Sequence, residues 1–115
     1  MTLTEPAGND GLNGTGSGHI TDSCIAYNVI CAGGVGFTDD TISNFASQGP
    51  SPAGRKKPDL VAVASGTGSG ANMSVVEQRW QNFSRLERGD TGTSFASPQV
   101  AGAAQILYSS GLTSP

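Results

Sequence analysis

The sequence predicts an α/β fold in which short buried strands precede one long helix. Two short apolar runs, Tyr27–Gly34 and Leu60–Ala64, both end at glycine-containing sequence, as buried strands do. A third stretch, Thr93–Ser109, is apolar on nearly all sides, and Gly111 is placed to end it, which predicts a buried helix. A chain of 115 residues fits one small domain.

The intervening segments have the composition of loops. Residues 8–18 hold five glycines among polar residues, which is typical of a long surface loop. Residues 38–58 contain adjacent aspartates and three prolines, so we expect turns there around one short strand near Thr41–Phe45. Glycine reaches 17 residues and apolar residues only 36%, which predicts a thin core.

Charge and hydropathy exclude several classes of partner. The net charge is -3 and the pI about 4.7, which argues against nucleic acid or an anionic membrane as a partner. A solvated turn accounts for the basic residues Lys56 and Lys57. No apolar run has the length of a membrane span, and the N-terminus has no features of a signal peptide.

Neither the cysteines nor the paired aspartates indicate a metal site. Cys24 and Cys31 are too few for zinc and could close only a small disulfide loop, so we expect both to be free and partly buried. Asp39 and Asp40 are adjacent, their carboxylates point apart, and no third ligand is evident. We interpret them as a turn.

Ser94 opens the predicted helix, where free backbone amides and the positive end of the helix dipole could stabilise an oxyanion. A serine at this position is more often a cap than a nucleophile. No Asp, Glu or His follows it, which excludes the chain order of α/β-hydrolases. Catalytic triads in which the acid and the histidine precede the serine remain possible. Within this chain such a triad would have to use the single histidine, His19.

The run Gly92–Gly102 (GTSFASPQVAG) closely resembles the nucleophile motif of the subtilases, Gly-Thr-Ser-Met-Ala-Ser/Thr-Pro-His-Val-Ala-Gly. Phe95 and Gln99 are the departures from it. Other segments resemble the same family in the same order, so that the likeness extends from Pro6 to about Leu112. They are Ala7–Gly11 (AGNDG), Asn28–Gly34 (NVICAGG), Ile42–Pro50 (ISNFASQGP) and Lys57–Ala62 (KPDLVA).

The resemblance implies a role for each matching residue. Ser94 would be the nucleophile, the Asn9 side chain and the Ser94 amide would form the oxyanion hole, and Thr93 would add a weaker contribution. Ala7 and Gly8 would line the primary specificity pocket. No metal ligand is implied and catalysis would need no cofactor, although structural calcium, with ligands that cannot be identified here, is common in the family. Pro6 stands where the family has alanine on a strand, and proline cannot donate to a ladder.

The family's acid and base are missing from this chain. Subtilases carry Asp, then His, then Ser, and nothing here resembles the Asp-Thr/Ser-Gly or His-Gly-Thr motifs. Residues 1–115 would therefore be the incomplete C-terminal segment of a subtilisin-like peptidase domain, with the upstream half of that domain as partner and a polypeptide as substrate. Asp10 and His19 match no catalytic motif and are poor substitutes.

The implied architecture is part of a three-layer sandwich with a mostly parallel sheet and a buried helix after the nucleophile. The implied reaction is peptide-bond hydrolysis through an acyl-serine. The resemblance also implies secretion, which is common in the family. The alternatives are a catalytically inactive remnant, a non-catalytic binding domain, and an adhesion module based on Arg88-Gly89-Asp90. We interpret that tripeptide as a turn. Residues 74–87 stay undecided, because apolar residues recur at helical spacing where the family usually has strands and loop.

Overall fold

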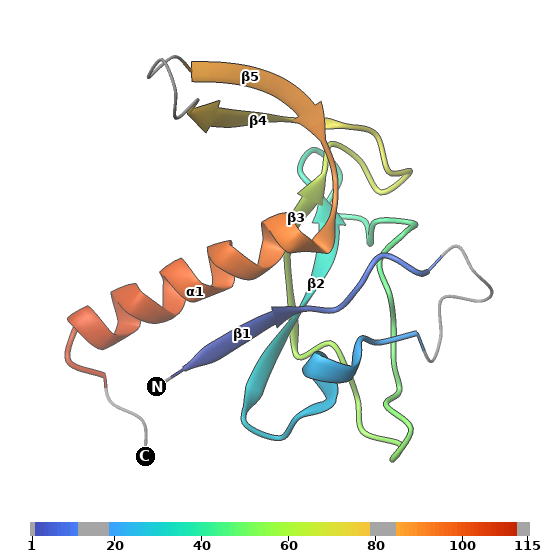
Figure 1. Cartoon of the computed structure of the whole chain (residues 1–115), viewed down its shortest axis with the longest axis vertical. Coiled ribbons are helices and arrows are strands. Elements are labelled where there is room, and N and C mark those ends of the chain that lie inside the picture. Colours follow the sequence, from blue (N-terminus) through green and yellow to red (C-terminus); the bar gives the residue numbers. More distant parts are fainter. Residues whose placement is uncertain (1, 12–18, 79–84, 113–115) are drawn as a thin grey trace.

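The computed structural model describes residues 2–11, 19–78 and 85–112. Its centre is a parallel sheet of three strands in the order β1-β2-β3, formed by Leu3–Pro6, Val29–Gly36 and Leu60–Ser65. The helix α1 (Thr93–Ser109) crosses one face of this sheet and packs against all three strands (Figure 1). The predicted α/β class and the two predicted strands are confirmed, and the helix has the predicted bounds. The expected burial of the second strand is wrong for its first two residues, because Leu60 is 42% exposed and Val61 44% exposed.

Small side chains let the helix approach the sheet closely. The core between them is formed by four buried residues, Ala32, Ala64, Ala96 and Val100. A Cβ added to Gly34 of β2 would lie 2.5 Å from the Cβ of Ala64 on the neighbouring strand and 3.4 Å from Thr93 Cγ2 of the helix, so a larger residue does not fit there. This is the thin core that the composition predicts.

The strand β1 lies at the edge of this sheet, which explains how it tolerates proline. Pro6 is the last residue of the strand, opposite Ala32. The next amide, that of Ala7, resumes the pairing and donates to the Ala32 carbonyl at 2.8 Å. A missing donor at a strand end therefore costs little.

The expectation that α1 is buried along its length is wrong. Its buried residues lie in the first two turns, whereas Ile106 is 70% exposed and Leu107 53% exposed. The three short strands cover one side of the helix, and its C-terminal half extends past them (Figure 1). No helix within the described ranges is long and apolar enough to cross a membrane.

The undecided stretch contains an antiparallel hairpin, β4 (Met73–Gln78) paired with β5 (Arg85–Asp90). Arg88 lies opposite Val75 and Asp90 opposite Met73, so the Arg-Gly-Asp tripeptide belongs to a paired strand. Its interpretation as a turn is wrong, because ladder pairing extends through it. The adhesion hypothesis, which requires a protruding loop, loses its structural basis.

The short strand expected near Thr41–Phe45 is also wrong. Ile42 makes an isolated bridge with Val35, and the chain then turns. The amides of Ser43 and Asn44 donate to the carbonyls of Gly34 and Gly68, at 2.9 and 2.8 Å, so they are used by two different segments and cannot continue a ladder.

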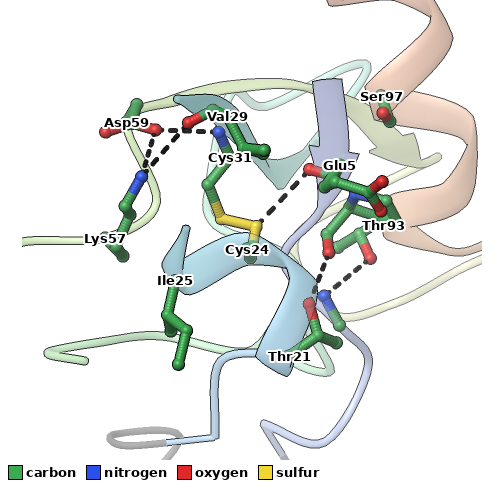
Figure 2. Close-up of a disulfide and its surroundings, with 12 residues drawn as sticks. Glu5, Thr21, Cys24, Ile25, Val29, Cys31, Lys57, Asp59, Thr93 and Ser97 are labelled. Atoms are coloured by element: carbon green, nitrogen blue, oxygen red, sulfur yellow. Dashed lines mark hydrogen bonds and ion pairs between the residues drawn. A yellow bond between two sulfur atoms is a disulfide. The ribbon is translucent and has the colours of Figure 1, made fainter. Parts of the chain in front are cut away.

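The two cysteines form a disulfide, which corrects the expectation that they are free (Figure 2). Cys24 lies on the short 3-10 helix η1 (Asp22–Ile25) and Cys31 on β2. The turn between them brings their Cα atoms to 5.1 Å, within the range that a disulfide requires. Both are fully buried and pack with Ala7, which follows β1.

An ion pair lies beside the disulfide, so the interpretation of Lys57 as part of a solvated turn is wrong (Figure 2). The Lys57 side chain is 4% exposed, and its Nζ lies 2.7 Å from Asp59 Oδ2. The same carboxylate accepts the Cys31 amide at 2.8 Å. Partial burial raises the pKa of Asp59, but the bonds from Cys31 and Lys57 and the charges of Lys57 and Arg55 outweigh it and hold the pKa below its usual value.

Replacing both Cys24 and Cys31 by alanine is expected to lower the free energy of unfolding by about 2–3 kcal/mol, because the unfolded chain regains the freedom of the closed loop. Urea unfolding of the variant and of oxidised wild-type chain measures this. An unchanged midpoint would show that the disulfide does not stabilise the fold.

Asp59→Asn is expected to lower stability at pH 7. The depressed folded pKa means that the carboxylate stabilises the fold above the unfolded pKa of about 4, and that this stabilisation is lost as pH falls through the folded value. The urea midpoints of variant and wild type should therefore converge in acid. A difference that persists at pH 2 would contradict the assignment, and the same change at Asp40 serves as control.

Candidate functional site

Three segments that are distant in sequence meet at the start of α1. The first follows β1 and contains Gly8 and Asn9, the second contains Ser47, and the third contains Thr93 and Ser94. The strand β1 delivers the first segment, and the end of β3 fixes the third, because the Gly92 amide donates to the Ala64 carbonyl at 2.9 Å. The C-terminal ends of these parallel strands thus bring the first and third segments together.

Thr93 binds Asn9 through two hydrogen bonds, although the residues are 84 positions apart. The Thr93 amide donates to Asn9 Oδ1 at 2.9 Å, and the Thr93 hydroxyl donates to the same oxygen at 3.0 Å. That hydroxyl accepts the Gly8 amide at 3.1 Å. The fully buried Thr93 side chain therefore joins the first segment to the helix.

These bonds fix the orientation of the Asn9 amide. A backbone N–H can only donate, so the side-chain atom that faces the Thr93 amide must be the oxygen. With Oδ1 occupied by Thr93, Nδ2 is the group of Asn9 that can donate elsewhere. It lies near Gly92, since a Cβ added to that glycine would be 3.5 Å from it.

Ser94 follows directly and is exposed, while its neighbours Thr93 and Ala96 are fully buried. Gly92 precedes the helix with φ at 149°, a conformation that favours glycine. As a residue of the first helical turn, Ser94 has an amide with no acceptor inside the helix. An oxygen placed here could accept from the Ser94 amide and from Asn9 Nδ2 together.

The profile of the subtilase family matches residues 6–112. The chain belongs to the subtilase family. It is 37% identical over 95% of its length to the membrane-bound transcription factor site-1 proteases of Homo sapiens and Mus musculus. The chain spans about 10% of the length of these relatives.

The residues expected to line the subtilase specificity pocket are buried. Ala7 is fully buried beside the disulfide. A Cβ added to Gly8, whose φ is 113°, would lie 2.8 Å from Ser47 Oγ and 2.9 Å from Thr21 Cγ2. Position 8 therefore requires glycine for two reasons, its backbone conformation and this close approach.

The described hydrogen bonds of the His19 and Asp10 amides lead to neighbouring residues of one segment, Gln48 and Ser47. The His19 amide donates to the Gln48 carbonyl at 3.3 Å, and the Asp10 amide to Ser47 Oγ at 3.0 Å. Among the described contacts, none joins His19 to Ser94. Their use as a substitute base and acid gains no support.

Asp39 and Asp40 form a turn, as expected. Asp39 Oδ1 and Oδ2 accept the Gly68 amide at 3.1 and 3.0 Å, and Oδ1 accepts the Thr41 amide at 3.1 Å. The bonds from Gly68 and Thr41 lower the pKa of this carboxyl. Within residues 2–11, 19–78 and 85–112, no group of three His, Cys, Asp or Glu side chains could hold a metal ion.

Thr93→Val is expected to destabilise the chain by about 1–3 kcal/mol, because it leaves the buried Gly8 amide without its acceptor. Thr93→Ser keeps the hydroxyl and removes a methyl group, which should cost about 1 kcal/mol. Chemical denaturation of both variants compares the two losses. A valine variant as stable as the serine variant would show that these hydrogen bonds do not hold the segments together.

Proposed function

We propose that residues 1–115 form the nucleophile-bearing, C-terminal segment of a subtilisin-like serine endopeptidase domain. The observation that carries this proposal is the pair of hydrogen bonds from Thr93 to Asn9, which lies directly beside the exposed Ser94. Family membership supports the reaction type, and a polypeptide is the substrate that a peptidase family implies.

In the proposed reaction, Ser94 Oγ attacks the scissile carbonyl carbon and forms a tetrahedral intermediate. Its proton passes to a histidine, which later donates it to the leaving amine as the acyl-serine forms. The Ser94 amide and Asn9 Nδ2 donate to the oxyanion. One such donor contributes about 3–4 kcal/mol to transition-state stabilisation, a value taken from another member of this family.

Thr93 supports the oxyanion hole indirectly in this arrangement. Its amide and hydroxyl are both directed at Asn9 Oδ1. The hydroxyl therefore orients the donor Asn9. Ala7 and Gly8 are buried, and their amides and carbonyls are already hydrogen-bonded within the chain. We therefore propose that they shape the wall of the specificity pocket and donate no free amide to substrate.

The histidine and its orienting aspartate would come from sequence upstream of residue 1. A serine hydroxyl without a base is a weak nucleophile, so the 115-residue chain alone would be inactive or nearly so. If no upstream sequence supplies these groups, the chain is an inactive remnant or a non-catalytic binding domain. Reading the gene upstream of the Met1 codon distinguishes these cases.

The decisive experiment is intact-mass analysis after exposure to a fluorophosphonate. We compare the 115-residue chain with an extended chain, defined as this chain preceded by the sequence that its own gene encodes upstream. The extended chain should be labelled on Ser94, Ser94→Ala should abolish labelling, and the 115-residue chain should remain unlabelled. Labelling of the short chain would show that an upstream base is not needed, and an unlabelled extended chain would favour the inactive alternatives.

A further inference from the structure

We propose that Ser47 is a positioning residue that holds the backbone on both sides of Asn9, so that the Asn9 side chain stays directed at the oxyanion. This inference rests on the proposed function of the site. Ser47 matches no catalytic residue of the nucleophile motif, and in the sequence it is an ordinary serine within Ile42–Pro50.

Ser47 contacts both peptide groups that flank Asn9. Its amide donates to the Gly8 carbonyl at 2.9 Å, and its Oγ accepts the Asp10 amide at 3.0 Å. Ser47 is 1% exposed, so its side chain is shielded from water. One buried residue therefore fixes the chain before and after Asn9.

The residues just before Ser47 are themselves held by hydrogen bonds. The Ala46 amide donates to the Ser43 carbonyl at 2.9 Å, and the Gly11 amide to the Phe45 carbonyl at 2.8 Å. The Ser43 hydroxyl is hydrogen-bonded to the Ser65 hydroxyl at the end of β3, at 2.7 Å. The segment that carries Ser47 is thus connected to the central sheet.

Thr93 and Ser47 have complementary roles. Thr93 binds the side-chain oxygen of Asn9, whereas Ser47 binds its two flanking peptide groups. Glycine at position 8 permits this approach, because a Cβ added there would lie 2.8 Å from Ser47 Oγ. Two fixed peptide groups and one fixed amide oxygen define where Nδ2 points.

Ser47→Ala removes the acceptor of the Asp10 amide and leaves the amide of residue 47 in place. In the extended chain it is expected to lower kcat on the order of 10-fold, which corresponds to one misaligned hydrogen bond. KM should hardly change, because the oxyanion exists only in the transition state.

The test is a double-mutant cycle in the extended chain, with Ser47→Ala and Asn9→Ala alone and combined. Because Ser47 acts through Asn9, Ser47→Ala should have little effect on kcat when Asn9 is already alanine. The control is Ser51→Ala, since Ser51 is buried and its Oγ accepts a backbone amide, that of Arg55 at 3.2 Å. Equal kcat losses from Ser47→Ala in both backgrounds, or an equal loss in the control, would overturn the proposal.

A second measurement separates this inference from the proposed function. In the 115-residue chain, hydrogen exchange of the Asp10 amide should be faster in Ser47→Ala, while exchange of the Thr93 amide reports whether the bond to Asn9 is retained. Unchanged Asp10 exchange would overturn the positioning role even if the extended chain is a peptidase. Faster exchange together with an unlabelled extended chain would support the geometry of Ser47 and reject the proposed function.

Discussion

The contact between Thr93 and Asn9 is the constraint on which the arrangement of this subtilase segment depends. It joins the segment after the first strand of the sheet to the first turn of the helix, across 84 positions of sequence. Two donors from one residue converge on a single amide oxygen, so the contact sets both a distance and an orientation. The exposed Ser94, one residue further on, takes its place relative to Asn9 from this contact.

The rest of the fold holds the two partners of this contact in position. On the helix side, Ala96 and Val100 pack against Ala32 and Ala64 of the sheet. On the other side, Ala7 packs against the disulfide between Cys24 and Cys31, and the Asp59 carboxylate binds the Cys31 amide (Figure 2). The half of α1 that lies farther from Ser94 lacks such cover, as the exposure of Ile106 shows.

The sequence correctly predicted the elements that have a local pattern of apolar residues. The predictions failed where the structure depends on contacts between distant segments. The helix Thr93–Ser109 and the strands β2 and β3 follow from apolar runs closed by glycine. The disulfide could not be predicted, because two cysteines give no information on whether a turn brings them together. The hairpin around Arg88–Asp90 depends on cross-strand register, which helical spacing of apolar residues obscured. Ser47 carries no local signal, since its role depends on contacts with Gly8 and Asp10.

The central claim is that Thr93 and Asn9 are joined before any substrate binds. The most direct measurement is a nuclear magnetic resonance experiment that detects scalar coupling across hydrogen bonds in the isotope-labelled 115-residue chain. We predict a coupling between the amide nitrogen of Thr93 and the side-chain carbonyl carbon of Asn9, together with slow exchange of the Thr93 amide. Absence of the coupling with rapid exchange of that amide would show that the two segments are not joined, and would contradict the account.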